Sequence, residues 1–182
     1  MALKPKIYKL RIALADIDRN YYDNLNLTVA QHPSETLERM MARVLAYCLN
    51  AQEALEFTKG ISVAEEPDIW VRSPDDRVSL WIDVGEPQFD RIKKATRIAD
   101  AVKVYCFNTK AEVWWEKGRD KFNGLSASFF RFQWPSIQTL ANLVQRAPAL
   151  SVTISGGSAY VSTEAGECEL ACAPCCSLDD SP

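Results

Sequence analysis

The sequence predicts one α/β domain, in which helices flank a mixed central sheet and a β-hairpin lies near each end of the chain. Three observations predict this class. Short segments alternate apolar and polar residues, as half-buried strands do, and longer segments repeat apolar residues every three or four positions, as helices do. In addition, 182 residues with 47% apolar and 25% charged content suffice for one packed core. We therefore expect a single domain over 1–182, with 167–182 as a flexible tail.

The first elements are a pair of strands and a helix. Segments 6–12 and 22–29 alternate, and the polar stretch 16–20 between them suits a turn, which predicts a hairpin. Pro33 ends the second strand, and Ser34 is the expected cap of the helix that follows. The apolar side of this helix consists of Leu37, Met40, Met41, Val44, Leu45 and Cys48.

The middle of the chain contains two short strands and an amphipathic helix. Segments 68–72 and 78–84 are joined by 73–77, a connection short enough to predict antiparallel neighbours. Gly85 and Pro87 end the second strand. In the following helix the apolar stripe is Phe89, Ile92, Ala95 and Ala99. The charged residues largely opposite it are Asp90, Lys93, Lys94 and Arg97.

The remaining elements continue the alternation of strands and helices. Segment 102–107 is nearly all apolar, which is typical of a buried central strand. A helix is predicted near 111–117, a strand at 126–132, a helix starting at Pro135, and a C-terminal hairpin from 150–154 and 159–161 around a Ser-Gly-Gly-Ser turn.

Composition and charge restrict the classes of function. The net charge of −3 gives no global attraction to phosphate backbones, so any contact with nucleic acid must be local. Charged residues interrupt every apolar run near the N-terminus, and no segment approaches about 18 uncharged apolar residues. We therefore expect a cytoplasmic protein that has no membrane segment. A monomer is a separate expectation.

Four of the six cysteines are crowded near the C-terminus, at Cys168, Cys172, Cys175 and Cys176. Their spacing would allow a zinc or redox site, but one tight cluster lacks the second ligand pair of a zinc ribbon. A reducing compartment also makes disulfides improbable. A frayed terminus is the favoured interpretation.

The predicted strand pair contains two acidic residues with a possible role in chemistry. Burial of the aliphatic positions of both strands fixes which side chains share a face, because a shift of one residue would turn Asp83 inward and Ile82 outward. With a five-residue connection, Asp68 then lies opposite Asp83. Opposed β-carbons in a sheet are about 5 Å apart, so two carboxylates there repel each other. A shared proton, an arginine such as Arg72, or a divalent cation would compensate.

Several stretches resemble one known family. They are His32-Pro33-Ser34-Glu35-Thr36, Glu38-Arg39-Met40-Met41, Glu66-Pro67, Leu80-Trp81-Ile82, Arg91-Ile92-Lys93-Lys94-Ala95 and Trp114-Trp115. In this order they resemble the bacterial YaeQ family from the start of the chain to about Val161. The cysteine-rich tail lies outside the resemblance.

The resemblance implies a variant of the restriction-endonuclease-like fold, whose site carries the pattern PD-(D/E)xK. Pro67-Asp68 and Asp83 fill its acidic positions, which implies Mg²⁺ bound by Asp68 and Asp83. The pattern's lysine, two residues past the second acid, is replaced by Gly85. Lys93 or Lys94 would have to take its place, although both also suit a solvated helix face.

A third carboxylate and two functions remain open at this point. Glu38 is the first candidate for the assisting glutamate and Glu35 its rival, which would otherwise complement the helix dipole. The only histidine, His32, suits a turn better than a general base.

One function that the sequence allows is metal-dependent hydrolysis of DNA or RNA. The alternative is a non-catalytic module that binds nucleic acid or a protein, which Gly85 and the acidic net charge favour.

Overall fold

A computed structural model describes residues 3–59, 63–145 and 148–175. Within them the chain forms ten strands and four helices, so the protein belongs to the α/β class with mixed sheets. Contacts divide the chain into two compact units, each built from two separate segments. Unit 1 comprises residues 1–49 and 132–172, and unit 2 comprises residues 50–131 and 173–182.

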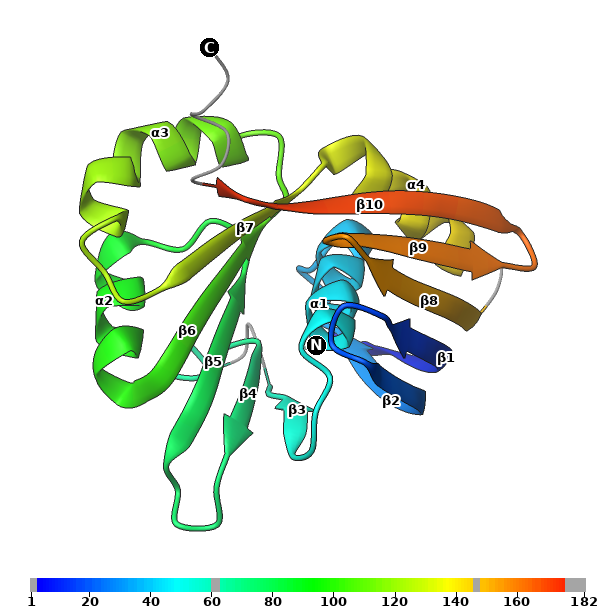
Figure 1. The fold of residues 1–182 in the computed structure, drawn as a ribbon, viewed down its shortest axis with the longest axis horizontal. Coiled ribbons are helices and arrows are strands. Elements are labelled where there is room, and N and C mark those ends of the chain that lie inside the picture. The colour runs from blue at the N-terminus through cyan, green and yellow to red at the C-terminus, as the bar shows by residue number, and fades with distance from the viewer. Residues whose placement is uncertain (1–2, 60–62, 146–147, 176–182) are drawn as a thin grey trace. The chain divides into compact units, whose positions relative to one another are not determined.

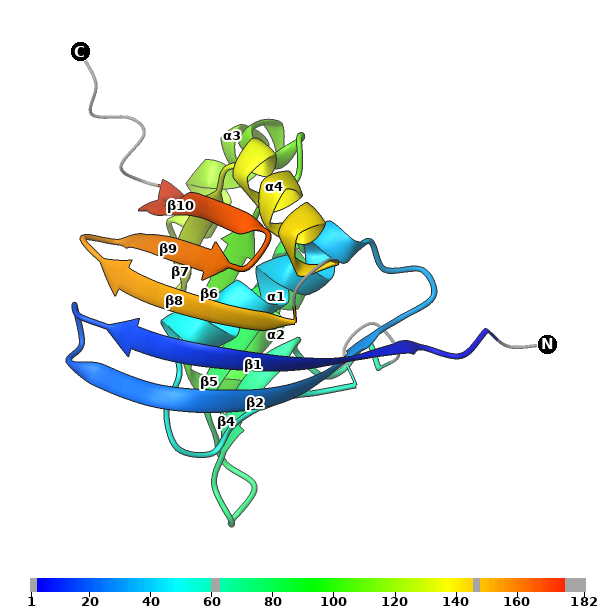
Figure 2. The ribbon, with the colours of Figure 1, turned by 90° about the vertical axis from the view of Figure 1, so that its right-hand side faces the viewer.

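Unit 1 contains five adjoining strands of a mixed sheet, in the order β2-β1-β8-β9-β10, seen in Figure 2. The strands are β1 (Lys6–Asp16), β2 (Tyr21–Gln31), β8 (Ala149–Ser155), β9 (Ser158–Thr163) and β10 (Gly166–Pro174). The predicted hairpins are confirmed: β1 pairs with β2, and β8 with β9, both antiparallel. β1 also pairs with β8 in parallel.

Two helices, α1 (Leu37–Leu49) and α4 (Trp134–Val144), cover one face of this sheet (Figure 2). Alternation in the strands turns every second side chain toward the helices, which is why the predicted apolar positions are buried. Fully buried side chains of this core include Leu10, Ile12, Met40, Met41, Leu45, Ile137 and Leu140.

The start of α1 differs from the prediction. The hydroxyl of Thr36, rather than that of Ser34, accepts a hydrogen bond from the backbone N–H of Arg39, at 3.2 Å. Ser34 Oγ instead lies 2.7 Å from Nδ1 of His32, within the turn that precedes the helix. Both serine and threonine are good caps, so the sequence alone did not separate these two positions.

Unit 2 contains five adjoining strands of the mixed sheet, in the order β7-β6-β5-β4-β3. Its strands are β3 (Leu55–Phe57), β4 (Ile69–Arg72), β5 (Val78–Val84), β6 (Ala99–Cys106) and β7 (Ser128–Phe132), and its helices are α2 (Phe89–Ile98) and α3 (Ala111–Phe122). β4 is antiparallel to β5, as predicted, whereas β5, β6 and β7 are parallel. The two parallel connections run through α2 and α3, which both lie on the same side of the strands (Figure 1).

An aromatic core lies between α2, α3 and this sheet. Trp115 and Phe122 of α3 stack at 5.8 Å between ring centroids, and Phe129 of β7 lies 5.1 Å from Phe122. Trp81 and Trp115 are buried in this cluster, so they serve packing rather than ligand stacking.

Three features of the sheets were not predicted. β3 has no counterpart among the predicted elements. β5 is buried on both faces, because α2 covers the side that carries Trp81 and Asp83. The predicted flexible tail at 167–182 is wrong for 167–174, which belong to β10; Cys176 and the residues after it lie outside the described part.

Candidate functional site

Two buried carboxylates meet where β4 begins and β5 ends. The ladder pairs Ile69 with Ile82 and Trp70 with Trp81, so one further step along both strands sets Asp68 beside Asp83. Asp68 is 4% exposed and Asp83 is 3% exposed. The register predicted from the sequence is therefore present, and both acids lie out of contact with bulk water.

Asp68 is fixed by backbone hydrogen bonds. Its Oδ2 accepts the N–H of Val84 at 2.7 Å, and its own N–H donates to the carbonyl of Ile82 at 3.0 Å. Its carbonyl accepts the N–H of Thr58 at 3.1 Å. Asp68 thus ties the end of β5 to the segment that precedes β4, a structural role that does not require a ligand.

Asp83 is bound by a single arginine from the first turn of α2. Arg91 Nε donates to Asp83 Oδ2 and Arg91 Nη2 donates to Oδ1, both at 3.0 Å. This is the two-pronged geometry that makes arginine the preferred partner of a buried carboxylate. The sequence suggested Arg72 for this role. Arg72 instead lies over the ring of Trp70, 4.8 Å from its centroid, and pairs with Asp76.

Arg91 also holds the segment before β4. Its Nη2 donates to the carbonyl of Glu66 at 2.8 Å, and its Nη1 donates to the carbonyl of Ala64. One side chain therefore joins α2, β5 and the 64–66 segment. The sequence did offer a signal for this residue, because Arg91 adjoins Ile92 and lies one turn before Ala95, both on the buried stripe of α2.

Burial raises the pKa of the Asp83 carboxyl above its ordinary value of 3.8. The hydrogen bonds and charge of Arg91 oppose this rise, and the neighbouring charge of Asp68 adds to it. Because the pKa is higher in the folded than in the unfolded protein, ionisation of Asp83 destabilises the fold.

This shift predicts the pH dependence of stability. The favourable effect of protonated Asp83 is present below pH 3.8 and is lost as the pH rises through the higher folded pKa. The free energy of unfolding of the wild type, measured in urea relative to Asp83→Asn, should therefore decrease as the pH is raised from about 4. A difference that increases over this range would contradict the raised pKa.

The donor set does not fit the Mg²⁺ site that the resemblance implies. Both oxygens of Asp83 are engaged by Arg91, and one oxygen of Asp68 is engaged by Val84. A cation placed here would meet the positive guanidinium at close range. Within residues 3–59, 63–145 and 148–175, no group of three or more His, Cys, Asp and Glu is arranged to hold a metal.

The two candidate glutamates have different surroundings. Glu38 is half-buried in the first turn of α1, in unit 1, whereas the carboxylate pair belongs to unit 2. Glu35 is buried and accepts hydrogen bonds from Arg43 Nε and Nη2, both at 2.8 Å, and from Arg39 Nη1 at 2.9 Å. Glu35 is therefore a structural residue, which fixes the segment directly before α1 to Arg39 and Arg43 of that helix.

The two candidate lysines lie on the exposed side of α2. Lys93 and Lys94 are both solvent-exposed, and Lys93 Nζ lies 5.8 Å from the ring centroid of Phe89. Lys94 borders a cavity of about 260 Å³ beside the carboxylate site. The cavity is lined by Ala64, Glu65, Trp81, Asp90, Arg91, Lys94 and Ala95.

Comparison with known proteins gives a consistent result. The family model described as YaeQ protein matches residues 1–172. The YaeQ protein of Salmonella typhi is 38% identical over 174 residues, which cover 93% of this chain and 95% of that protein, and the YaeQ protein of Escherichia coli K12 is 37% identical with the same coverage. Two crystal structures of YaeQ proteins are also similar, each at 32% sequence identity. The structure from Xanthomonas axonopodis pv. citri has a TM-score of 0.90 and covers 94% of this chain and 98% of its own. The structure from Pseudomonas syringae has a TM-score of 0.87 and covers 94% of this chain and 96% of its own.

Finally, no helix in the described part of the chain is long and apolar enough to cross a membrane.

Proposed function

The chain belongs to the YaeQ family, and we propose that this member binds nucleic acid through the basic face of α2 without cleaving it. The basic face consists of Lys93, Lys94 and Arg97, all solvent-exposed. Residues three and four positions apart are neighbours on a helix, so these side chains form one patch. Asp90 is the only acidic residue of α2.

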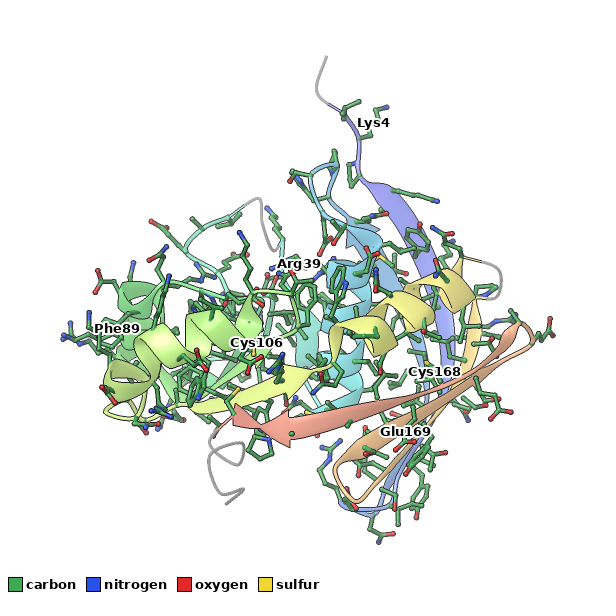
Figure 3. All side chains as sticks on the ribbon, turned by 90° about the horizontal axis from the view of Figure 1, so that it is seen from above. Lys4, Arg39, Phe89, Cys106, Cys168 and Glu169 are labelled. Carbon is green, nitrogen blue, oxygen red and sulfur yellow. The ribbon has the colours of Figure 1, made fainter. Side chains whose placement is uncertain are left out.

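The observation that carries the proposal is an aromatic ring that has two cations, from different helices, near it. Phe89 is half-buried at the start of α2, and Figure 3 shows it with nitrogen-tipped side chains beside it. Lys93 Nζ of α2 and Lys121 Nζ of α3 each lie 5.8 Å from its ring centroid. A ring among ammonium groups suits a polyanion whose phosphates and bases lie side by side. This local charge also meets the requirement set by the overall net charge of −3.

Two features support binding without hydrolysis. Arg91 occupies both oxygens of Asp83, so the acid that the nuclease pattern assigns to the metal already has a cation. Gly85, at the position of the pattern's lysine, has φ +116°, a conformation that residues with a side chain rarely adopt. Its N–H also donates to the carbonyl of Tyr105 at 2.8 Å, which joins β5 to β6. The backbone at position 85 thus disfavours the lysine, independently of the available space.

The metal-dependent nuclease is the rival function, with Asp68 and Asp83 holding Mg²⁺, Glu38 assisting, and Lys93 or Lys94 in place of the missing lysine. This function requires Arg91 to leave Asp83 when substrate and metal bind. Binding and cleavage can both be measured on the same protein preparation.

Binding is tested by fluorescence anisotropy with labelled single-stranded DNA, single-stranded RNA and duplex oligonucleotides. Charge reversal in Lys93→Glu/Lys94→Glu should weaken binding by about tenfold or more and reduce the dependence of affinity on salt. The matched control is Lys6→Glu/Lys9→Glu, which alters net charge equally on exposed positions of β1. An equal loss in the control, or no binding by wild type at low salt, would refute the proposed surface.

Cleavage is tested separately with plasmid DNA and RNA in Mg²⁺ and in Mn²⁺. We expect intact substrates. Metal-dependent cleavage that disappears in a folded Asp83→Asn variant would establish the nuclease instead, whatever the binding experiment shows.

A further inference from the structure

Two thiols from distant parts of the sequence meet in the aromatic core of unit 2. Cys106 is the last residue of β6, and Cys175 directly follows β10, 69 positions later. Their sulfur atoms lie 3.8 Å apart, and both residues are at most 1% exposed. We propose that this pair is a site of oxidative modification, at which a hydroperoxide forms a reversible Cys106–Cys175 disulfide.

The geometry requires only a short movement. A disulfide has its sulfur atoms about 2.05 Å apart, so the pair must close by less than about 2 Å. The Cys106 sulfur also lies 3.3 Å from the carbonyl of Phe130, an alternative acceptor for its single thiol proton. Cys175 belongs to the buried cluster that includes Trp115 and Phe129, so both sulfurs are held in place by packing.

The two sulfurs are not equivalent. The hydrogen bond from the Cys106 thiol lowers the pKa of Cys175, and the positive charge of Arg131 acts in the same direction, although burial opposes both. The same contact, together with burial, raises the pKa of Cys106. Since the thiolate is the nucleophile, this asymmetry assigns the first step to Cys175 and the second to Cys106.

The chemistry balances with one hydroperoxide. The Cys175 thiolate attacks one oxygen of hydrogen peroxide, the O–O bond breaks, and the departing hydroxide takes a proton to leave as water. The resulting sulfenic acid is attacked by the sulfur of Cys106. The S–O bond breaks, and the departing hydroxide takes the thiol proton of Cys106 as the second water. Two thiols are oxidised by two electrons, and the peroxide is reduced by two.

Other cysteines of the same chain provide internal comparisons. Burial raises the pKa of Cys48 to about 12 and that of Cys168 to about 11, so both are poor nucleophiles near neutral pH. Figure 3 marks Cys106 and Cys168 on their separate strands. All five cysteines in the described residues are free thiols.

The test treats the full-length, fully reduced protein with a small excess of hydrogen peroxide and maps it by mass spectrometry after blocking of the remaining thiols. We expect the loss of two hydrogens, a cross-link between the tryptic peptide holding Cys106 and the C-terminal one, and full reversal by dithiothreitol. Closing so long a loop should also raise the melting temperature by about 5 to 15 °C.

Variants identify the partner of Cys106. No lysine or arginine follows Arg146, so a single tryptic peptide holds all four C-terminal cysteines. Cys172→Ser and Cys176→Ser should keep the cross-link, and Cys175→Ser and Cys106→Ala should lose it. If Cys106→Ala does not fold, the Cys175→Ser variant and the wild-type peptide map together show whether Cys175 is the partner of Cys106. A cross-link that survives in Cys175→Ser, or sulfinic acid at Cys175 without a cross-link, would overturn the proposal.

Discussion

Replacing Arg91 with methionine is expected to lower the free energy of unfolding at pH 7 by about 3 kcal/mol, because the buried carboxylate of Asp83 loses its paired cation. The guanidinium is 32% exposed, but its partner is only 4% exposed, so water cannot replace the lost hydrogen bonds. The same substitution removes the hydrogen bonds from Arg91 to the carbonyls of Ala64 and Glu66. Chemical denaturation monitored by tryptophan fluorescence measures the change.

A second substitution separates the charge from the packing. The double variant Arg91→Met/Asp83→Leu should be more stable than Arg91→Met alone, since an apolar pair needs no desolvated charge. Lys94→Met serves as the control for the loss of a positive charge on the same helix, and we expect a change within about 0.5 kcal/mol. If Arg91→Met proves as mild as Lys94→Met, then Arg91 does not neutralise Asp83 in solution.

Replacing Glu35 with alanine is expected to destabilise the fold by about 3 to 5 kcal/mol, because it leaves the guanidinium of Arg43 buried without its carboxylate. The Arg43 side chain is 5% exposed, and one of its nitrogens also donates to the carbonyl of Ala30 on β2 at 2.9 Å. Glu35 therefore links α1 to the hairpin through Arg43. Thermal and urea unfolding both report the loss.

The neighbouring glutamate provides the control for this variant. Glu38→Ala removes the same side chain from the first turn of α1, where it is half-buried, and should cost no more than about 1 kcal/mol. Equal effects at the two positions would show that the Glu35 cluster contributes no more than a favourable charge at the start of the helix.

Much of the fold could be predicted from local patterns. The two hairpins and the pairing of β4 with β5 follow from alternation and from short connections, and the structure confirms them. The register that brings Asp68 to Asp83 was also predictable, because only one parity buries Ile69 and Ile82 together.

The features that the sequence did not reveal depend on contacts distant in the chain. The role of Arg91 is not evident from the sequence, because its own helix places it beside other cations and only the packing of α2 on β5 turns it toward Asp83. Trp81 and Asp83 suggested a polar face because they alternate with aliphatic residues, whereas α2 covers them both. β10 is not evident from the sequence, because its small and acidic residues have weak strand propensity and its pairing with β9 determines its conformation.

The division of the chain into interleaved units also has a consequence for biosynthesis. The ribosome delivers β1 and β2 first, yet the parallel neighbour of β1 is β8, whose Ala149 pairs with Arg11. Between them the chain supplies nearly all of unit 2. One edge of β1 therefore stays unpaired until residues 149–154 emerge from the ribosome. An unpaired strand edge is a ready template for wrong association, so this interval is when a nascent chain most needs protection by a chaperone.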